Sequence, residues 1–89
     1  MENKVIEKLT NTLEKFNQKN IKINQTGFIS NQVFIKKLKY KIEYDVLKIE
    51  DIQEEIYVYI NLNQVYETQI EDTQILLKLD NDTQIKMRL

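Results

Sequence analysis

The strongest constraint on the fold is a two-residue alternation in residues 55–62, which read Glu-Ile-Tyr-Val-Tyr-Ile-Asn-Leu. The aliphatic residues occupy the even positions, and Tyr57 and Tyr59 occupy odd ones. Successive side chains of a strand point to opposite faces, so this pattern predicts a strand with one aliphatic face. β-branched and aromatic residues suit a half-buried sheet. We interpret the segment as a central strand whose tyrosines point away from the core.

A second periodicity, of helical spacing, occupies residues 3–18 and predicts an amphipathic helix. Asn3 is the expected N-cap, and Asn20 is the expected stop signal. A helix this short is marginal in water on its own, so its apolar stripe needs a partner surface, which the sheet would provide. The stripe consists of Val5, Ile6, Leu9, Leu13 and Phe16.

The remaining chain predicts further strands and tight turns. Residues 21–23 alternate, and the only glycine, Gly27, marks the turn that follows. Residues 33–49 look extended, but the apolar parity changes near Asp45, which indicates a hairpin or, as an alternative, a bulged long strand. Residues 72–89 predict a terminal hairpin around Asp-Asn-Asp.

These elements predict one α+β domain spanning residues 1–89, with an N-terminal helix packed on an antiparallel sheet of about five strands. A strongly curled or barrel-like sheet is the allowed variant. Apolar residues make up 42 % of the chain, as in globular proteins. No apolar run reaches the ~18–20 residues of a membrane span. We therefore expect a cytoplasmic protein with no membrane partner.

The residue types available argue against an enzyme. The chain has no cysteine, no histidine and one serine, Ser30, so no familiar pairing of nucleophile and base can be built. Paired carboxylates fall in predicted turns, where they would be solvated; they are Asp51 with Glu54 and Glu55, Glu71 with Asp72, and Asp80 with Asp82. The segment Asp80-Asn81-Asp82 begins like a calcium loop, but the glycine and glutamate that complete such a loop are missing. We expect no catalytic residue, cofactor or metal.

An acidic, aromatic patch is the first candidate site. Tyr57 and Tyr59, with Glu54, Glu55 and Glu67 around them, would form a contact surface for a protein partner. Tyrosine is enriched at protein interfaces, where it provides contact area. The alternative is that the tyrosines only pack against cross-strand neighbours.

A basic cluster is the second candidate. It comprises Lys36, Lys37, Lys39 and Lys41, with Tyr40 as a nearby aromatic. Lysines along a strand can follow a phosphate backbone, so a β-domain that binds nucleic acid is the alternative function. Lysines on an edge strand also protect against edge-to-edge pairing, which needs no ligand.

The function we predict is a small non-enzymatic adaptor, regulator or inhibitor that binds a protein partner through an exposed sheet face. A homo-oligomer formed through a sheet edge is a further expectation. Residues 1–41 carry a net charge of +6 and residues 42–89 a net charge of −7, so the halves can also simply attract each other. The residue usage is typical of AT-rich coding DNA, as in low-GC bacteria and their phages.

Overall fold

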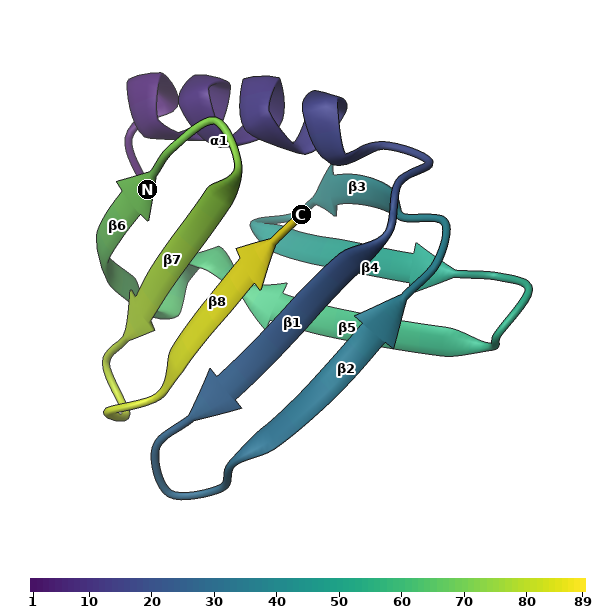
Figure 1. Ribbon diagram of the computed structural model, residues 1–89. Coiled ribbons are helices and arrows are strands. Elements are labelled where there is room, and N and C mark those ends of the chain that lie inside the picture. The colour runs from purple at the N-terminus through teal and green to yellow at the C-terminus, as the bar shows by residue number, and fades with distance from the viewer.

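The computed structural model describes all residues from Met1 to Leu89 and contains one α-helix and two antiparallel sheets (Figure 1). The predicted α+β class with an N-terminal helix is confirmed. The predicted single sheet of about five strands is wrong, because eight strands divide into a five-stranded and a three-stranded sheet. The sheets do not close into a barrel. They enclose one cluster of 16 buried hydrophobic residues.

The elements follow one another along the chain with short connections. The five-stranded sheet has the order β2-β1-β8-β7-β6, with β1 (Ile21–Thr26), β2 (Asn31–Ile35), β6 (Val65–Ile70), β7 (Gln74–Leu79) and β8 (Gln84–Arg88). The three-stranded sheet has the order β3-β4-β5, with β3 (Lys39–Glu43), β4 (Val46–Asp51) and β5 (Ile56–Asn61). The helices are α1 (Asn3–Phe16) and the short 3-10 helix η1 (Leu62–Gln64).

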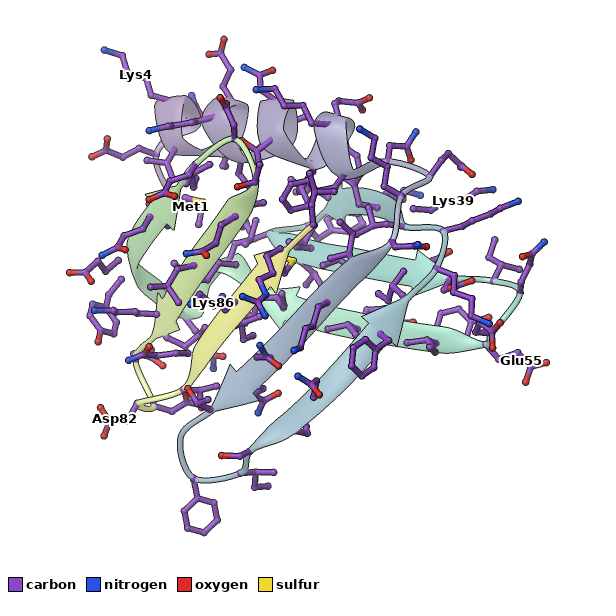
Figure 2. All side chains as sticks on the ribbon, viewed as in Figure 1. Met1, Lys4, Lys39, Glu55, Asp82 and Lys86 are labelled. Atoms are coloured by element: carbon purple, nitrogen blue, oxygen red, sulfur yellow. The ribbon has the colours of Figure 1, made fainter.

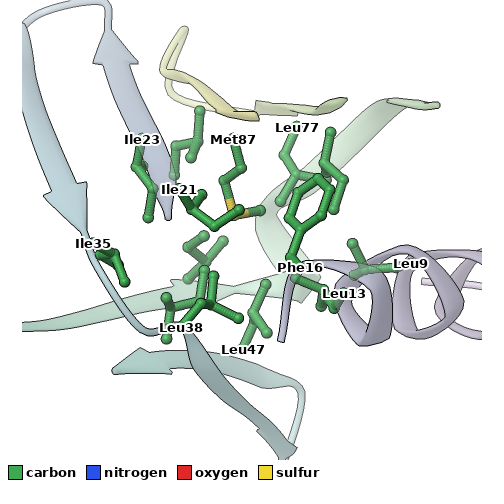
Figure 3. Packing of buried hydrophobic residues seen from close by; sticks show 14 of the residues in the cluster. Leu9, Leu13, Phe16, Ile21, Ile23, Ile35, Leu38, Leu47, Leu77 and Met87 are labelled. Carbon is green, nitrogen blue, oxygen red and sulfur yellow. The ribbon is translucent and has the colours of Figure 1, made fainter. Parts of the chain in front are cut away.

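Helix α1 runs across one end of both sheets (Figure 1). Its residues Leu9, Leu13 and Phe16 are fully buried, and Figure 3 shows them converging with side chains from both sheets. The predicted N-cap is wrong, because Asn3 is the first helical residue and Glu2 is the N-cap, without a side-chain hydrogen bond. No helix in the structure has the length and apolar character that crossing a membrane requires.

Two polar contacts attach α1 to the sheets. Lys15 Nζ lies 2.7 Å from Asp72 Oδ1, in the loop between β6 and β7. The Tyr40 hydroxyl of β3 donates a hydrogen bond to Glu14 Oε1. Consecutive helical residues are thus connected to different sheets, which fixes the position of the helix over both.

The parity change near Asp45 is a hairpin, as preferred from the sequence. Tyr44 and Asp45 both have positive φ, 52° and 61°, between β3 and β4. Two successive positive φ angles give a tight turn that matches the twist of the strands. The predicted terminal hairpin is also present, formed by β7 and β8.

Gly27 lies in the turn between β1 and β2, as predicted, with φ of 134°. Side chains rarely adopt this conformation. A Cβ atom at Gly27 would also lie 2.8 Å from the carbonyl oxygen of Asp82 and 3.1 Å from Thr83 Cα. The β1–β2 turn therefore packs directly on the β7–β8 turn, and glycine alone allows this contact.

The prediction that residues 55–62 form a central strand is wrong in one respect. The strand is present as β5, and its alternation is as expected, but β5 pairs only with β4 and is an edge strand. The alternation reports which face is buried, and it carries no information about how many neighbours the strand has. The inner side chains of β5 pack in the core between the two sheets, so their burial does not require a second hydrogen-bonded strand beside β5.

Candidate functional site

The tyrosines of β5 lie on the outer face of the three-stranded sheet, which we call the three-strand face. Strand register defines this face, because directly opposed residues of antiparallel strands point to the same side. One row across the sheet is Lys39, Glu50 and Tyr57, and the next is Lys41, Lys48 and Tyr59. The third row is Glu43, Val46 and Asn61.

Tyr57 and Tyr59 are the largest exposed side chains of this face, with 52 % and 63 % of their surface accessible. Val58, which lies between the two tyrosines, and Ile60, which follows them, point inward, and Ile60 is buried. The core therefore holds β5 through its inner side chains, while its tyrosines remain available for contact. This is the orientation predicted from the alternation.

Charges on the three-strand face are interleaved. Lys41 Nζ lies 2.7 Å from Glu43 Oε2. The hydrogen bond from Lys41 and its charge lower the pKa of the Glu43 carboxyl, with a further contribution from Lys48. The same contact with Glu43 raises the pKa of Lys41. The face therefore offers both signs of charge beside the tyrosines, three lysines against two glutamates.

An apolar groove of about 280 Å³ runs beside β5. Val58 of β5 and Val33 of β2 line it from the two sheets, together with Tyr57 and Tyr59. Both β5 and β2 are edge strands, so unpaired backbone groups border the groove. The tyrosines therefore lie where a sheet face, an open strand edge and a groove meet.

The three predicted acidic neighbours of the tyrosines are dispersed. Glu54 and Glu55 lie in the turn between β4 and β5, and Figure 2 shows Glu55 where that turn leads into β5. Glu54 forms an ion pair with Lys36 at 3.2 Å. Glu67 lies on β6 of the other sheet, with Lys78 Nζ at 2.7 Å. The carboxylate that the register places directly beside a tyrosine is instead that of Glu50, opposite Tyr57.

The predicted basic cluster is divided among different surroundings. Lys36 and Lys37 lie in the bend between β2 and β3, whereas Lys39 and Lys41 lie on the three-strand face. Tyr40 has the opposite parity and points inward, toward the helix. Burial, together with the hydrogen bond to Glu14 and the charge of Glu14, raises the pKa of Tyr40 to about 12.

Asp51 organises the loops at one end of the three-stranded sheet, a role that the sequence analysis missed. Its side chain is among the few buried polar groups, and the residue is 1 % exposed. Asp51 Oδ2 accepts hydrogen bonds from the backbone N–H groups of Lys36, at 2.9 Å, and Lys37, at 3.4 Å. Oδ1 accepts one from the N–H of Glu54 at 3.4 Å. Burial opposes ionisation, but these N–H donors lower the pKa of Asp51 overall.

No group of three or more acidic side chains comes together in a way that could hold a metal ion. Comparisons with protein-family models, with curated proteins and with solved structures find no match to this chain.

Proposed function

We propose that this chain is a non-enzymatic protein-interaction module that binds an extended segment of a protein partner along β5. The observation that carries the proposal is the position of Tyr57 and Tyr59 on a strand with an unpaired edge. An added strand would gain main-chain hydrogen bonds from β5, and contacts with alternate side chains would provide specificity.

The surroundings of β5 support this mode of binding. The edge of β5 carries no charged residue between Ile56 and Asn61, unlike β3, whose lysines protect the opposite edge. The groove between Val58 and Val33 can accept an apolar side chain of the added strand. On the three-strand face, the partner's neighbouring side chains would meet the tyrosines and the interleaved charges.

The chemistry expected of the partner follows from these contacts. Alternate residues of an added strand point to opposite sides. One set, aliphatic in type, would enter the groove. The other set, aromatic or polar, would lie beside Tyr57 and Tyr59. The proposed partner segment is therefore an extended peptide with alternating apolar and polar residues.

The test is a selection of peptides from a random library on the immobilised chain, followed by affinity measurement for the enriched peptides. We expect Tyr57→Ser and Tyr59→Ser together to weaken binding strongly, since an interface tyrosine of this kind contributes about 2 kcal/mol. Amide hydrogen exchange should show that bound peptide protects backbone N–H groups of β5.

The matched control replaces two other exposed tyrosines, Tyr44→Ser and Tyr66→Ser, which lie off the three-strand face. Peptide binding should survive in this variant. The proposal fails if selected peptides bind the Tyr57/Tyr59 variant as tightly as the unmodified chain. The proposal also fails if bound peptide protects the backbone N–H groups of another edge strand, such as β2, instead of those of β5.

A further inference from the structure

The outward side chains of the five-stranded sheet form a second surface, which we call the five-strand face. Its four cations are Lys22 on β1, Lys78 on β7 and both Lys86 and Arg88 on β8, and its single carboxylate is Glu67 on β6. Glu67 pairs with Lys78 at 2.7 Å. The remaining three cations have no carboxylate within ion-pair distance. The face therefore carries an uncompensated positive charge in a chain whose net charge is −1.

An aromatic side chain lies beside these cations. Strand register places Lys22 between Phe34 on β2 and Arg88 on β8. Lys22 Nζ lies 5.7 Å from the centre of the Phe34 ring, which is a cation–π distance. Phe34 is 62 % exposed, although it is apolar. The exposed ring is thus a candidate stacking surface with Lys22 over it and Arg88 one strand further across the sheet.

The rest of the face is a shallow hollow of about 720 Å³ lined largely by amide side chains. Lys86 extends from β8 in this part of the sheet, as Figure 2 shows. Asn24 accepts a 2.8 Å hydrogen bond from the side-chain amide of Gln32. Gln69, Gln74 and Gln84 complete the set of amides. Each amide offers both donors and an acceptor, as the exposed edges of nucleic-acid bases do.

We infer that the five-strand face binds a single-stranded nucleic acid. Lys22, Lys86 and Arg88 contact phosphates, a base stacks on Phe34, and the amides of the hollow contact base edges. Positive charge without nearby carboxylates is complementary to a polyanion. An exposed aromatic ring adds stacking, which requires unpaired bases and so selects a single strand over a duplex. The surface is assembled from residues far apart in the chain. It does not include residues 36–41, although Lys36 and Lys37 line one pocket together with Lys22 and Phe34.

The test is fluorescence anisotropy with labelled single-stranded RNA and DNA of about ten nucleotides, within the usual site size of a small β-domain. Binding should weaken as salt rises, with a slope of log K against log salt of about −2, because three phosphate contacts each contribute about −0.7 for a single strand. Comparison of the RNA and DNA arms identifies which nucleic acid the amides favour, and either one supports the inference.

Two sets of variants distinguish binding by the five-strand face from a general effect of the chain's net charge. The triple variant Lys22→Gln, Lys86→Gln and Arg88→Gln should abolish binding. A matched triple variant with the same change in net charge, at Lys4, Lys8 and Lys19, should retain most of it. Phe34→Ala should weaken binding by about tenfold, and Phe34→Tyr should retain it, since base stacking needs only an aromatic ring.

Several outcomes would overturn the inference. They are absence of binding at low salt, equal binding of duplex DNA, and equal binding of heparin, which carries charge without bases. Another is that changing Lys37, Lys39 and Lys41 to Gln abolishes binding while the five-strand variants still bind nucleic acid. That result would assign the site to the basic cluster. Circular dichroism of each variant establishes that the fold is intact.

Discussion

The three-strand face and the five-strand face differ most in how their charges are balanced. On the first, three lysines and two glutamates share the face with two tyrosines, and Lys41 and Glu43 are in direct contact. On the second, three cations lack a carboxylate partner and the remaining polar groups are mostly amides. Balanced charge with tyrosines suits a protein partner, whereas unbalanced positive charge with an exposed ring suits a polyanion. One small core thus supports two surfaces of different composition.

Both faces belong to one cooperative unit if they depend on the same core, and a substitution at Phe16 is the strongest test of this. Its ring is fully buried in the cluster that both sheets share. Phe16→Ala should lower the free energy of unfolding by about 3–5 kcal/mol, as removal of a buried aromatic ring usually does. Urea unfolding followed by circular dichroism measures the loss.

The control for Phe16 is Phe28→Ala, because Phe28 is 96 % exposed and should change stability by less than about 0.5 kcal/mol. Amide exchange should accelerate in both sheets of the Phe16 variant. Acceleration confined to one sheet would show that the two faces unfold independently.

A substitution at Gly27 should affect the five-stranded sheet before the three-stranded sheet. Gly27→Ala places a side chain at φ of 134° and against the backbone of Asp82. We expect a loss of about 1–3 kcal/mol from backbone strain, with more from the clash between the two turns. Ser30→Ala, in the same turn region, should have little effect. An unfolding midpoint unchanged by Gly27→Ala would show that the turns can separate at no cost.

Asp51 provides the corresponding test for the three-stranded sheet. Its pKa is lowered in the folded chain, so its contribution to stability is present above the ordinary aspartate pKa and is lost as pH falls through the lower folded value. Unfolding midpoints measured from neutral pH into the acid range should therefore decline less steeply for Asp51→Asn than for the unmodified chain. At neutral pH, the variant should be less stable than Asp80→Asn, whose side chain is exposed. Parallel pH curves for the two variants would contradict this.

The smallest effect is spectroscopic and concerns the contact between Tyr40 and Glu14. Absorbance of tyrosinate should show one of the five tyrosines titrating near pH 12, because burial and Glu14 raise the pKa of Tyr40 to about 12. The stability that this contact provides is fully present below about pH 10, the ordinary tyrosine pKa, and is lost as pH rises toward 12. Tyr40→Phe should remove the titration step near pH 12, and Glu14→Gln should move that step to lower pH. If the step near pH 12 persists in Tyr40→Phe, it belongs to another tyrosine.

Local patterns predicted the elements of the fold well. The helix, the turn at Gly27, the hairpin at Asp45 and the terminal hairpin all depend on residues close in sequence, and all are present. The orientation of Tyr57 and Tyr59 followed from the alternation for the same reason. Helix capping was less predictable, because Asn3 can start a helix equally well as a cap or as its first residue.

The division into two sheets and the composition of the faces could not be predicted from local pattern. Pairing of β1 with β8 joins Ile23 to Met87, and no short-range signal specifies such a contact. The same pairing places Lys22 beside Arg88, so the five-strand face exists only through long-range register. Asp51 was placed with solvated turn carboxylates, because its N–H donors come from a distant bend at Lys36 and Lys37.

The position of β8 has a consequence for how the chain reaches this fold during synthesis. β8 is the central strand of the five-stranded sheet, between β1 and β7, yet among the strands of that sheet it comes last in the sequence. Until β8 is synthesised, a nascent chain leaves one edge of β1 and one edge of β7 without their final partner. Non-local pairing of this kind slows folding, and unpaired edges favour aggregation. We therefore expect truncation before residue 84 to leave an aggregation-prone intermediate, because β1 and β7 would each keep an unpaired edge.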